Sequence, residues 1–197
     1  MKPIWSLPLV AFLFFAGCFT TRYVAPDAPS IPGDYYARII NKPFDQTWSA
    51  LMRYAGSAYF DIQQFEKQSG LLVLSFGAPI PSEYITGGHF NATGGMRFDG
   101  DFVDFCVIHE GGYLEDRMNV IVTPVDSGRT KVGVRVHYVF TCAVSETGAD
   151  SWSFESGTSD THDAARVFNS AGQRKARTLM PTYKAERTLL DAVEGTE

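Results

Sequence analysis

Alternating apolar and polar positions are clearest in residues 130–145, where every second side chain is apolar. Because successive side chains of a strand point to opposite faces, this period of two predicts a strand with one buried face, and Cys142 falls on that face. Gly-Gly and Asp-Ser-Gly turns separate this segment from two others at 101–109 and 116–125, which we also predict to be strands.

A period of three to four residues follows Asn41-Lys42-Pro43, and its apolar members are Phe44, Trp48, Leu51, Met52 and Ala55. This spacing predicts a helix with one broad apolar face, starting at the proline and ending near Gly56. Strand-like runs occur at 35–40, 60–65 and 71–76, and a hairpin loop joins the last two. The first half of the chain therefore predicts a β-α-β-β order.

Residues 77–100 carry repeated glycine and proline and predict a long irregular insertion. Long loops inside compact domains often carry function. We therefore place a possible binding surface on this insertion, at Tyr84, Ile85, His89 and Phe90.

The polar segment 146–172 gives no assignment, whereas Pro181 is expected to start a final helix with a modest apolar stripe. Four cations near that helix are interpreted as a solvated face: Lys175, Arg177, Lys184 and Arg187. The order of elements predicts an α+β fold, a single domain at 34–197. We expect an antiparallel sheet packed on one long helix, as in helix-grip or TBP-like domains, with a C-terminal helix.

Residues 1–18 have the pattern of an export signal. Lys2 gives a positive start, residues 7–16 are apolar, and Phe15-Ala16-Gly17-Cys18 ends the run with small residues before a cysteine. The run is too short to cross a bilayer, which takes about 20 apolar residues. Its end resembles the lipobox of bacterial lipoproteins, with Phe15 where leucine is usual. A signal peptide with a chance cysteine and a buried N-terminal helix are the alternatives.

The lipobox resemblance implies a signal peptide at 1–17 and a lipidated N-terminus with a flexible tether at 18–33. Acylation of Cys18 would attach the chain to a membrane, and Phe19 in place of aspartate favours the periplasmic face of the outer membrane. A tether of this length reaches up to about 45 Å from the anchor. Its prolines also suit an extended segment lying on a partner's surface.

Charge and cysteine content narrow the expected partners. The net charge is −5 and no basic run occurs, so we do not expect nucleic acid as a partner; we expect proteins or small molecules instead.

Once Cys18 is assigned to lipid, Cys106 and Cys142 remain. An oxidising periplasm favours a disulfide between them, and two small buried thiols on strands are the other interpretation.

Motifs that carry chemistry are sparse. The histidines lack the spacing of metal ligands: His89, His109, His137 and His162. A cluster of acidic residues does not match the pattern of a calcium-binding loop: Asp99, Asp101, Asp104 and Glu110. No GxSxG, SxxK or P-loop sequence occurs. We therefore expect no enzyme, no cofactor and no metal.

A second resemblance covers about 45 residues of the 197. Residues 42–51, followed by Phe60-Asp61-Ile62 and by residues 67–72, resemble a pattern found in small Gram-negative envelope lipoproteins. These include domains like those in the C-subunit lipoprotein of the outer-membrane β-barrel assembly machinery. Most matched positions are core or turn positions, and Glu66 stands where aspartate is usual. The resemblance implies a scaffold or accessory role without catalytic residues.

Two functions follow as hypotheses. The first is a membrane-tethered interaction module of an envelope complex, which uses 77–100 or an exposed sheet edge against a protein partner. The alternative is a periplasmic binding domain that holds a small apolar ligand or lipid in a cavity between helix and sheet. A cavity of several hundred Å³ would favour the ligand, whereas a packed core with an exposed apolar patch would favour the interaction module.

Overall fold

The computed structural model describes residues 20–27, 35–58, 60–93, 97–144, 148–164 and 175–195, which form an α+β fold with mostly antiparallel strands. The helices are α1 (Phe44–Ser57), α2 (Phe102–Glu110) and α3 (Lys184–Gly195), with a 3-10 turn η1 (Pro81–Glu83). The strands are β1 (Thr20–Val24), β2 (Ala37–Ile40), β3 (Asp61–Glu66), β4 (Leu71–Gly77), β5 (Ile85–Thr86), β6 (His89–Thr93), β7 (Phe98–Asp101), β8 (Tyr113–Pro124), β9 (Thr130–Val144), β10 (Gly148–Glu155), β11 (Asp160–Ala164) and β12 (Lys175–Pro181). No helix in these ranges is long and apolar enough to span a bilayer.

The largest sheet has six strands in the order β10-β9-β8-β4-β3, with β2 also paired to β9. Its centre is the β8–β9 hairpin, in register from Tyr113 opposite Thr141 to Pro124 opposite Thr130. The predicted alternation of β9 is confirmed, since every second side chain is at most 5% exposed: Val132, Val134, Val136, Tyr138, Phe140 and Cys142. At the β3–β4 turn, Gly70 has φ of 71°, and a Cβ there would overlap the Val122 carbonyl oxygen.

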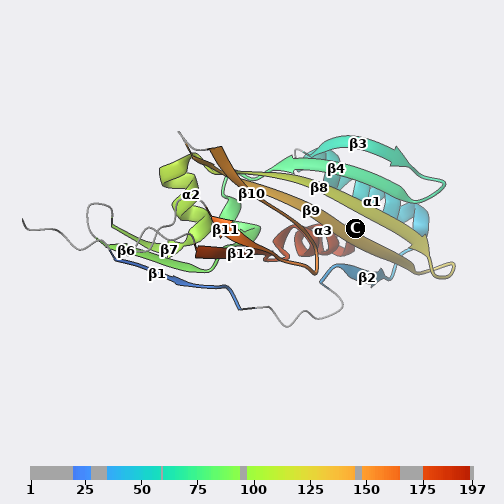
Figure 1. The fold of residues 1–197 in the computed structure, drawn as a ribbon. Helices are drawn as coiled ribbons and strands as arrows, with labels where there is room; N and C mark the ends of the chain where they lie inside the picture. Colours follow the sequence, from blue (N-terminus) through green and yellow to red (C-terminus); the bar gives the residue numbers. More distant parts are fainter. Residues whose placement is uncertain are drawn as a thin grey trace, which may run out of the picture.

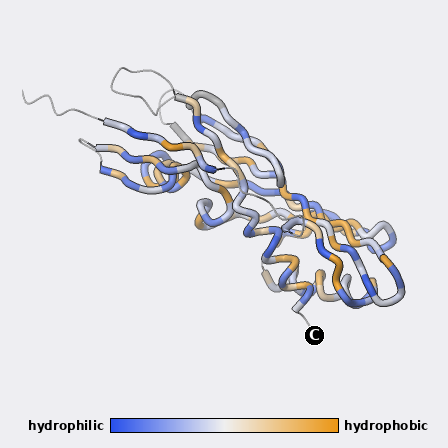
Figure 2. Tube along the Cα trace, turned by 90° about the horizontal axis from the view of Figure 1, so that it is seen from below, coloured by the Kyte–Doolittle hydropathy of each residue, from blue (hydrophilic) through white to orange (hydrophobic). Residues whose placement is uncertain are grey.

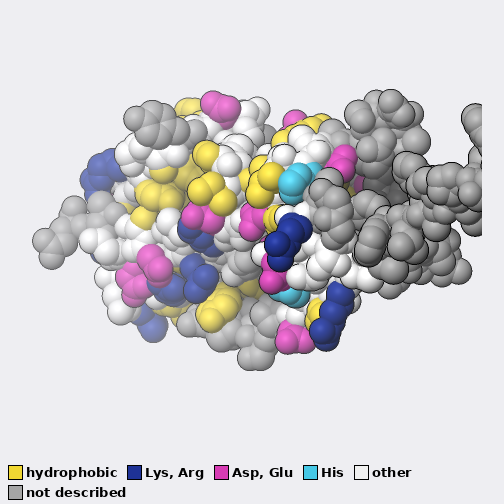
Figure 3. Space-filling view, turned by 90° about the vertical axis from the view of Figure 1, so that its left-hand side faces the viewer, with side chains coloured by type: hydrophobic (Ala, Val, Ile, Leu, Met, Phe, Trp, Pro, Cys, Tyr) yellow, Lys and Arg dark blue, Asp and Glu magenta, His cyan; other side chains and the backbone are white. Residues whose placement is uncertain are grey.

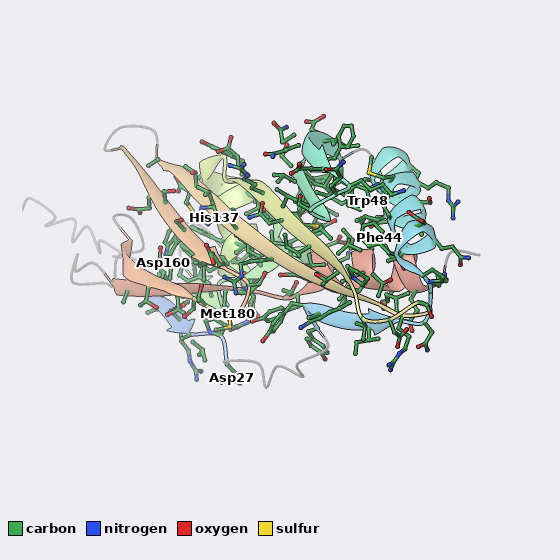
Figure 4. The ribbon with its side chains drawn as sticks, turned by 90° about the vertical axis from the view of Figure 1, so that its right-hand side faces the viewer. Asp27, Phe44, Trp48, His137, Asp160 and Met180 are labelled. Atoms are coloured by element: carbon green, nitrogen blue, oxygen red, sulfur yellow. A yellow bond between two sulfur atoms is a disulfide. The ribbon has the colours of Figure 1, made fainter. Side chains whose placement is uncertain are left out.

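Two helices, α1 and α3, pack against each other and cover one face of this sheet (Figure 1). The predicted apolar face of α1 is confirmed, because Trp48, Leu51 and Ala55 are buried. Phe44 and Trp48 stack with ring centroids 6.1 Å apart (Figure 4). The last helix begins at Lys184 rather than at Pro181, which instead ends β12.

A helix lies where we predicted a strand at 101–109. The Asp101 carboxylate caps α2 by accepting a hydrogen bond from the Val103 N–H at 2.8 Å, and Gly111 ends the helix with φ of 65°. Apolar side chains surround the helix almost completely, so no helical period is visible in the sequence. The prediction is wrong because the caps, rather than the hydrophobic pattern, define this element.

Smaller sheets form the other part of the molecule, with strand orders β1-β6-β7 and β11-β12-β5. The 77–100 segment, predicted to be irregular, contains η1, β5, β6 and β7, and the unassigned 146–172 segment contains β10 and β11. The molecule is elongated, with the β8–β9 turn at one end and β6 and β7 at the other (Figure 1, Figure 2).

The predicted tether at 18–33 is interrupted by β1, which pairs with β6 along its whole length. Tyr23 of this strand lies under the Arg177 guanidinium, whose carbon is 4.2 Å from the ring centroid. Arg177 was predicted to be solvated and is instead 0% exposed. Its burial follows from β12 being an inner strand of its sheet, with aromatic side chains packed over the cation.

Candidate functional site

The face of the six-stranded sheet opposite α1 and α3 carries a groove of about 750 Å³, here called the sheet-face groove. Outward-pointing residues of β2, β3, β4, β8 and β9 line it. Along each strand these residues alternate with residues of the core, because successive side chains point to opposite faces of the sheet. The same alternation that forms the core therefore also places the residues of the groove. The face of the sheet opposite the two helices is therefore hollowed by its own side chains.

The floor of the sheet-face groove is an apolar row across four strands. Leu71, Ile121, Gly133 and Ala37 are successive cross-strand partners on β4, β8, β9 and β2. Gly133 has no side chain, and a Cβ there would find only the Ile121 carbonyl oxygen, at 3.9 Å. Ile121 is 46% exposed, so the row is open to a partner.

Cations border this apolar row. Arg117, Lys131 and Arg135 line the groove together with the amides Asn119 and Gln64. Arg135 lies 3.7 Å from the Glu155 carboxylate, a separation at the long end for an ion pair. Among the described residues Arg117 and Lys131 take part in no ion pair, so the rim can accept anionic groups.

A polar cluster is buried on the opposite side of the same sheet, beneath α3. Glu186, at 0% exposure, accepts hydrogen bonds from the Tyr138 hydroxyl at 3.0 Å and the Ser156 hydroxyl at 2.6 Å. Burial raises the pKa of Glu186 and raises that of Tyr138 well above its usual value.

Asp116 is the cross-strand partner of Tyr138, and neither of its carboxyl oxygens has a hydrogen-bond partner among the described residues. Burial, and secondarily the charge of Glu186, raises the pKa of Asp116 to about 8. The Asp116 carboxyl is therefore mostly protonated at neutral pH.

A second hollow, here called the aromatic pocket, has a volume of about 340 Å³ and lies between the end of α1, the start of α3 and the 77–84 segment. Four rings surround it in sequence, with centroids 5.8, 5.3 and 5.6 Å apart: Tyr54, Phe60, Phe76 and Tyr84. Burial raises the pKa of Tyr54. The pocket is in the size range of small-ligand sites.

The four residues predicted as a binding surface do not form one. Ile85 and Phe90 are 0% and 1% exposed and belong to the core, because the 77–100 segment folds into strands. His89 is exposed and lies 2.9 Å from Asp99. Tyr84 lines the aromatic pocket. Cys18 lies outside the described residues.

Cys106 and Cys142 are joined in a disulfide, with their Cα atoms 5.4 Å apart. Cys106 belongs to α2 and Cys142 to β9, so the bridge ties a helix to the main sheet. We predicted that both cysteines lie on strands. This is wrong for Cys106, which lies on the helix α2.

The described ranges contain a serine–histidine contact but no metal-binding cluster. No cluster of His, Cys, Asp or Glu there could hold a metal ion. The Ser153 hydroxyl lies 3.3 Å from His137 Nε2, a contact that sequence reasoning did not predict. Within the described part of the chain no carboxylate bonds to His137, so the orienting member of a hydrolytic triad is not found there.

No family model, curated protein or solved structure matches this chain.

Proposed function

We propose that this chain is a lipoprotein anchored through Cys18 on the periplasmic face of the outer membrane, where it acts as a non-catalytic interaction module of an envelope complex. The export pattern of residues 1–18 supports the anchor. The disulfide between Cys106 and Cys142 suits an oxidising compartment.

The sheet-face groove is the observation that carries the proposed interaction. The groove has an apolar floor, and two of its bordering cations, Arg117 and Lys131, form no ion pair with described residues. Such a surface is complementary to a protein segment with apolar side chains and neighbouring carboxylates. The occupant is therefore an acidic amphipathic segment of another envelope protein. Residues 77–100, our first choice from the sequence, are replaced in this role by β8 and β9.

We also propose a helix-grip-like arrangement, in which the sheet curves around α1 with α3 beside it. The packing of both helices on one face supports this arrangement. We further propose a scaffold or accessory role like that of the C-subunit lipoprotein of the outer-membrane β-barrel assembly machinery, which residues 42–51, 60–62 and 67–72 resemble.

Site-specific photocrosslinking in intact envelopes tests the interaction. A photoreactive residue at Ile121 should trap a protein partner, and the trapped peptide should contain Asp or Glu next to apolar residues. The matched control is the same residue at Ser49, which is exposed on α1. Charge reversal at Lys131 and Arg117 should abolish trapping at Ile121 while the protein stays folded. Equal trapping at both positions, or trapping that survives charge reversal, would refute a groove-specific partner.

The aromatic pocket supports a second candidate function, the binding of a small apolar ligand. Its rings supply an apolar enclosure, and the hydroxyls of Tyr54 and Tyr84 form no hydrogen bond to described residues, so both are free for a ligand. Native mass spectrometry of protein purified from envelopes should then detect a bound molecule that is lost in Ala185→Trp, which fills the pocket. A Ser49→Trp control should keep it. Ligand retained in Ala185→Trp would exclude this pocket.

A further inference from the structure

The strand β1 starts very close to the proposed anchor. Thr20 is two residues after Cys18, and two extended residues span about 7 Å at most. An acyl chain on Cys18 would therefore hold Thr20 next to the lipid surface. This inference rests on the proposed acylation of Cys18.

Contacts with two sheets fix β1 in place. It pairs with β6 over five residues, from Thr20 to Val24. The Tyr23 hydroxyl accepts a hydrogen bond from the Thr178 N–H at 3.0 Å and donates one to the Thr178 carbonyl at 3.4 Å. The Tyr23 ring also contacts Phe102 edge-on, with centroids 6.4 Å apart. Because β1 is held from both sides, its position relative to the anchor sets the orientation of the whole domain.

The same contacts show which surface lies beside Thr20. Thr93 is its partner on β6, and Phe98 of β7 pairs one residue further on, with Ala92. The ring of His109, in the last turn of α2, lies 5.9 Å from the ring of Phe98. Among the described residues this end of the molecule therefore includes the start of β1, the end of β6, the start of β7, the last turn of α2 and the start of β8.

Two exposed apolar side chains project from this end. Ile108 of α2 is 65% exposed and Tyr113 at the start of β8 is 49% exposed. Tyrosine is enriched where a membrane meets water, since its ring is apolar and its hydroxyl is polar. Figure 3 shows this end of the molecule, where hydrophobic side chains lie among cationic, acidic and histidine side chains.

We propose that this end, with Ile108 and Tyr113, rests on the lipid headgroups of the membrane in which Cys18 is anchored. The β8 strand then leads away from the bilayer for 12 residues, or about 40 Å at roughly 3.3 Å per residue. The sheet-face groove, which begins near Arg117 and extends to Thr123, therefore faces the aqueous compartment.

Quenching of an added tryptophan by brominated lipids tests this orientation. The protein is the chain from Cys18 onward, whose only free thiol is Cys18 because the other two cysteines are bridged. Coupling Cys18 to a maleimide phospholipid in phosphatidylethanolamine and phosphatidylglycerol vesicles supplies an anchor independent of cellular acylation. The compared variants are Ile108→Trp and Val125→Trp. Val125 is also an exposed apolar residue, at 46%, but it belongs to the β8–β9 turn, which lies at the opposite end of the molecule. The native Trp48 and Trp152 are buried and give a constant background.

The expected result is a blue shift and loss of emission for Ile108→Trp in brominated vesicles, with no change for Val125→Trp. Similar quenching in both variants, or none in Ile108→Trp, would overturn the orientation. Mass spectrometry of the N-terminus from cells tests acylation separately, so its failure would remove the proposed anchor and leave the orientation measurement interpretable.

Discussion

Replacing Asp116 by asparagine should change how the stability of this protein depends on pH. The side chain is 6% exposed and its carboxyl oxygens have no partner among the described residues. Burial raises its pKa from 3.8 to about 8 in the folded protein. Between these values the folded state keeps a proton that the unfolded state has released. The free energy of unfolding therefore falls as pH rises through this window.

The size of the effect follows from the pKa difference. Each pH unit inside the window removes about 1.4 kcal/mol from the free energy of unfolding. Between pH 5 and pH 8 the loss is roughly 3 to 4 kcal/mol, because the folded carboxyl itself begins to ionise near the upper limit. Glu186, whose pKa is also raised by burial, contributes in the same direction. Asp116→Asn keeps the shape of the side chain and removes its part of this loss.

Urea unfolding at pH 5, 6, 7 and 8, monitored by tryptophan fluorescence with the disulfide intact, measures the effect. The native protein should lose stability toward pH 8, and Asp116→Asn should lose much less. The control is Asp126→Asn, an exposed turn residue whose pKa is lowered chiefly by its hydrogen bond from Arg129, and it should leave the pH 5 to 8 slope unchanged. The same slope in native protein and Asp116→Asn would refute the reasoning, as would a carbon-13 titration that places the pKa of Asp116 near 4.

Three further predictions concern stability. Replacing both Cys106 and Cys142 by serine should lower the free energy of unfolding by about 4 kcal/mol, because the disulfide closes a long loop. Reduction of the native protein should lower it by a similar amount, and an unchanged urea midpoint would contradict this prediction. Tyr23→Phe removes both hydrogen bonds to the Thr178 backbone and should speed amide exchange throughout β1, at a cost of about 1 to 3 kcal/mol, whereas unaltered exchange would show that β1 is held by other contacts. Gly70→Ala forces a side chain into a left-handed turn against the backbone of Val122 and should lower the melting temperature. Gly128→Ala should be nearly neutral, because its Cβ would meet only the Asp126 carboxylate, at an ordinary contact distance of 3.9 Å.

Elements with one buried face could be predicted from the sequence. The alternation in β9 and the spacing of Trp48 and Leu51 in α1 each reflect a single boundary between core and solvent. The groove residues Arg135 and Gly133 were also visible, as the outward members of the β9 alternation. Ile121, the cross-strand partner of Gly133, and Leu71, the partner of Ile121, could not be assigned to the groove, because only the strand order brings them into the same row.

Elements defined by contacts distant in sequence could not be predicted. The 101–109 segment is apolar on all sides, which erases its helical period, and only its caps identify it. Arg177 is buried because Tyr23, more than a hundred residues earlier, packs against its guanidinium. The glycines of 77–100 suggested an open loop, although Gly88, with φ of 78°, lies at a close approach to the backbone of Val24.

The pairing of β1 with β6 has a mechanical consequence. A pull on the chain before Thr20, directed along β1 and away from the domain, loads the backbone hydrogen bonds of this pair side by side. In this shear geometry the bonds must rupture together, whereas a perpendicular pull would open them one after another. The first strand can therefore act as a force-bearing clamp between the N-terminal segment and the rest of the domain.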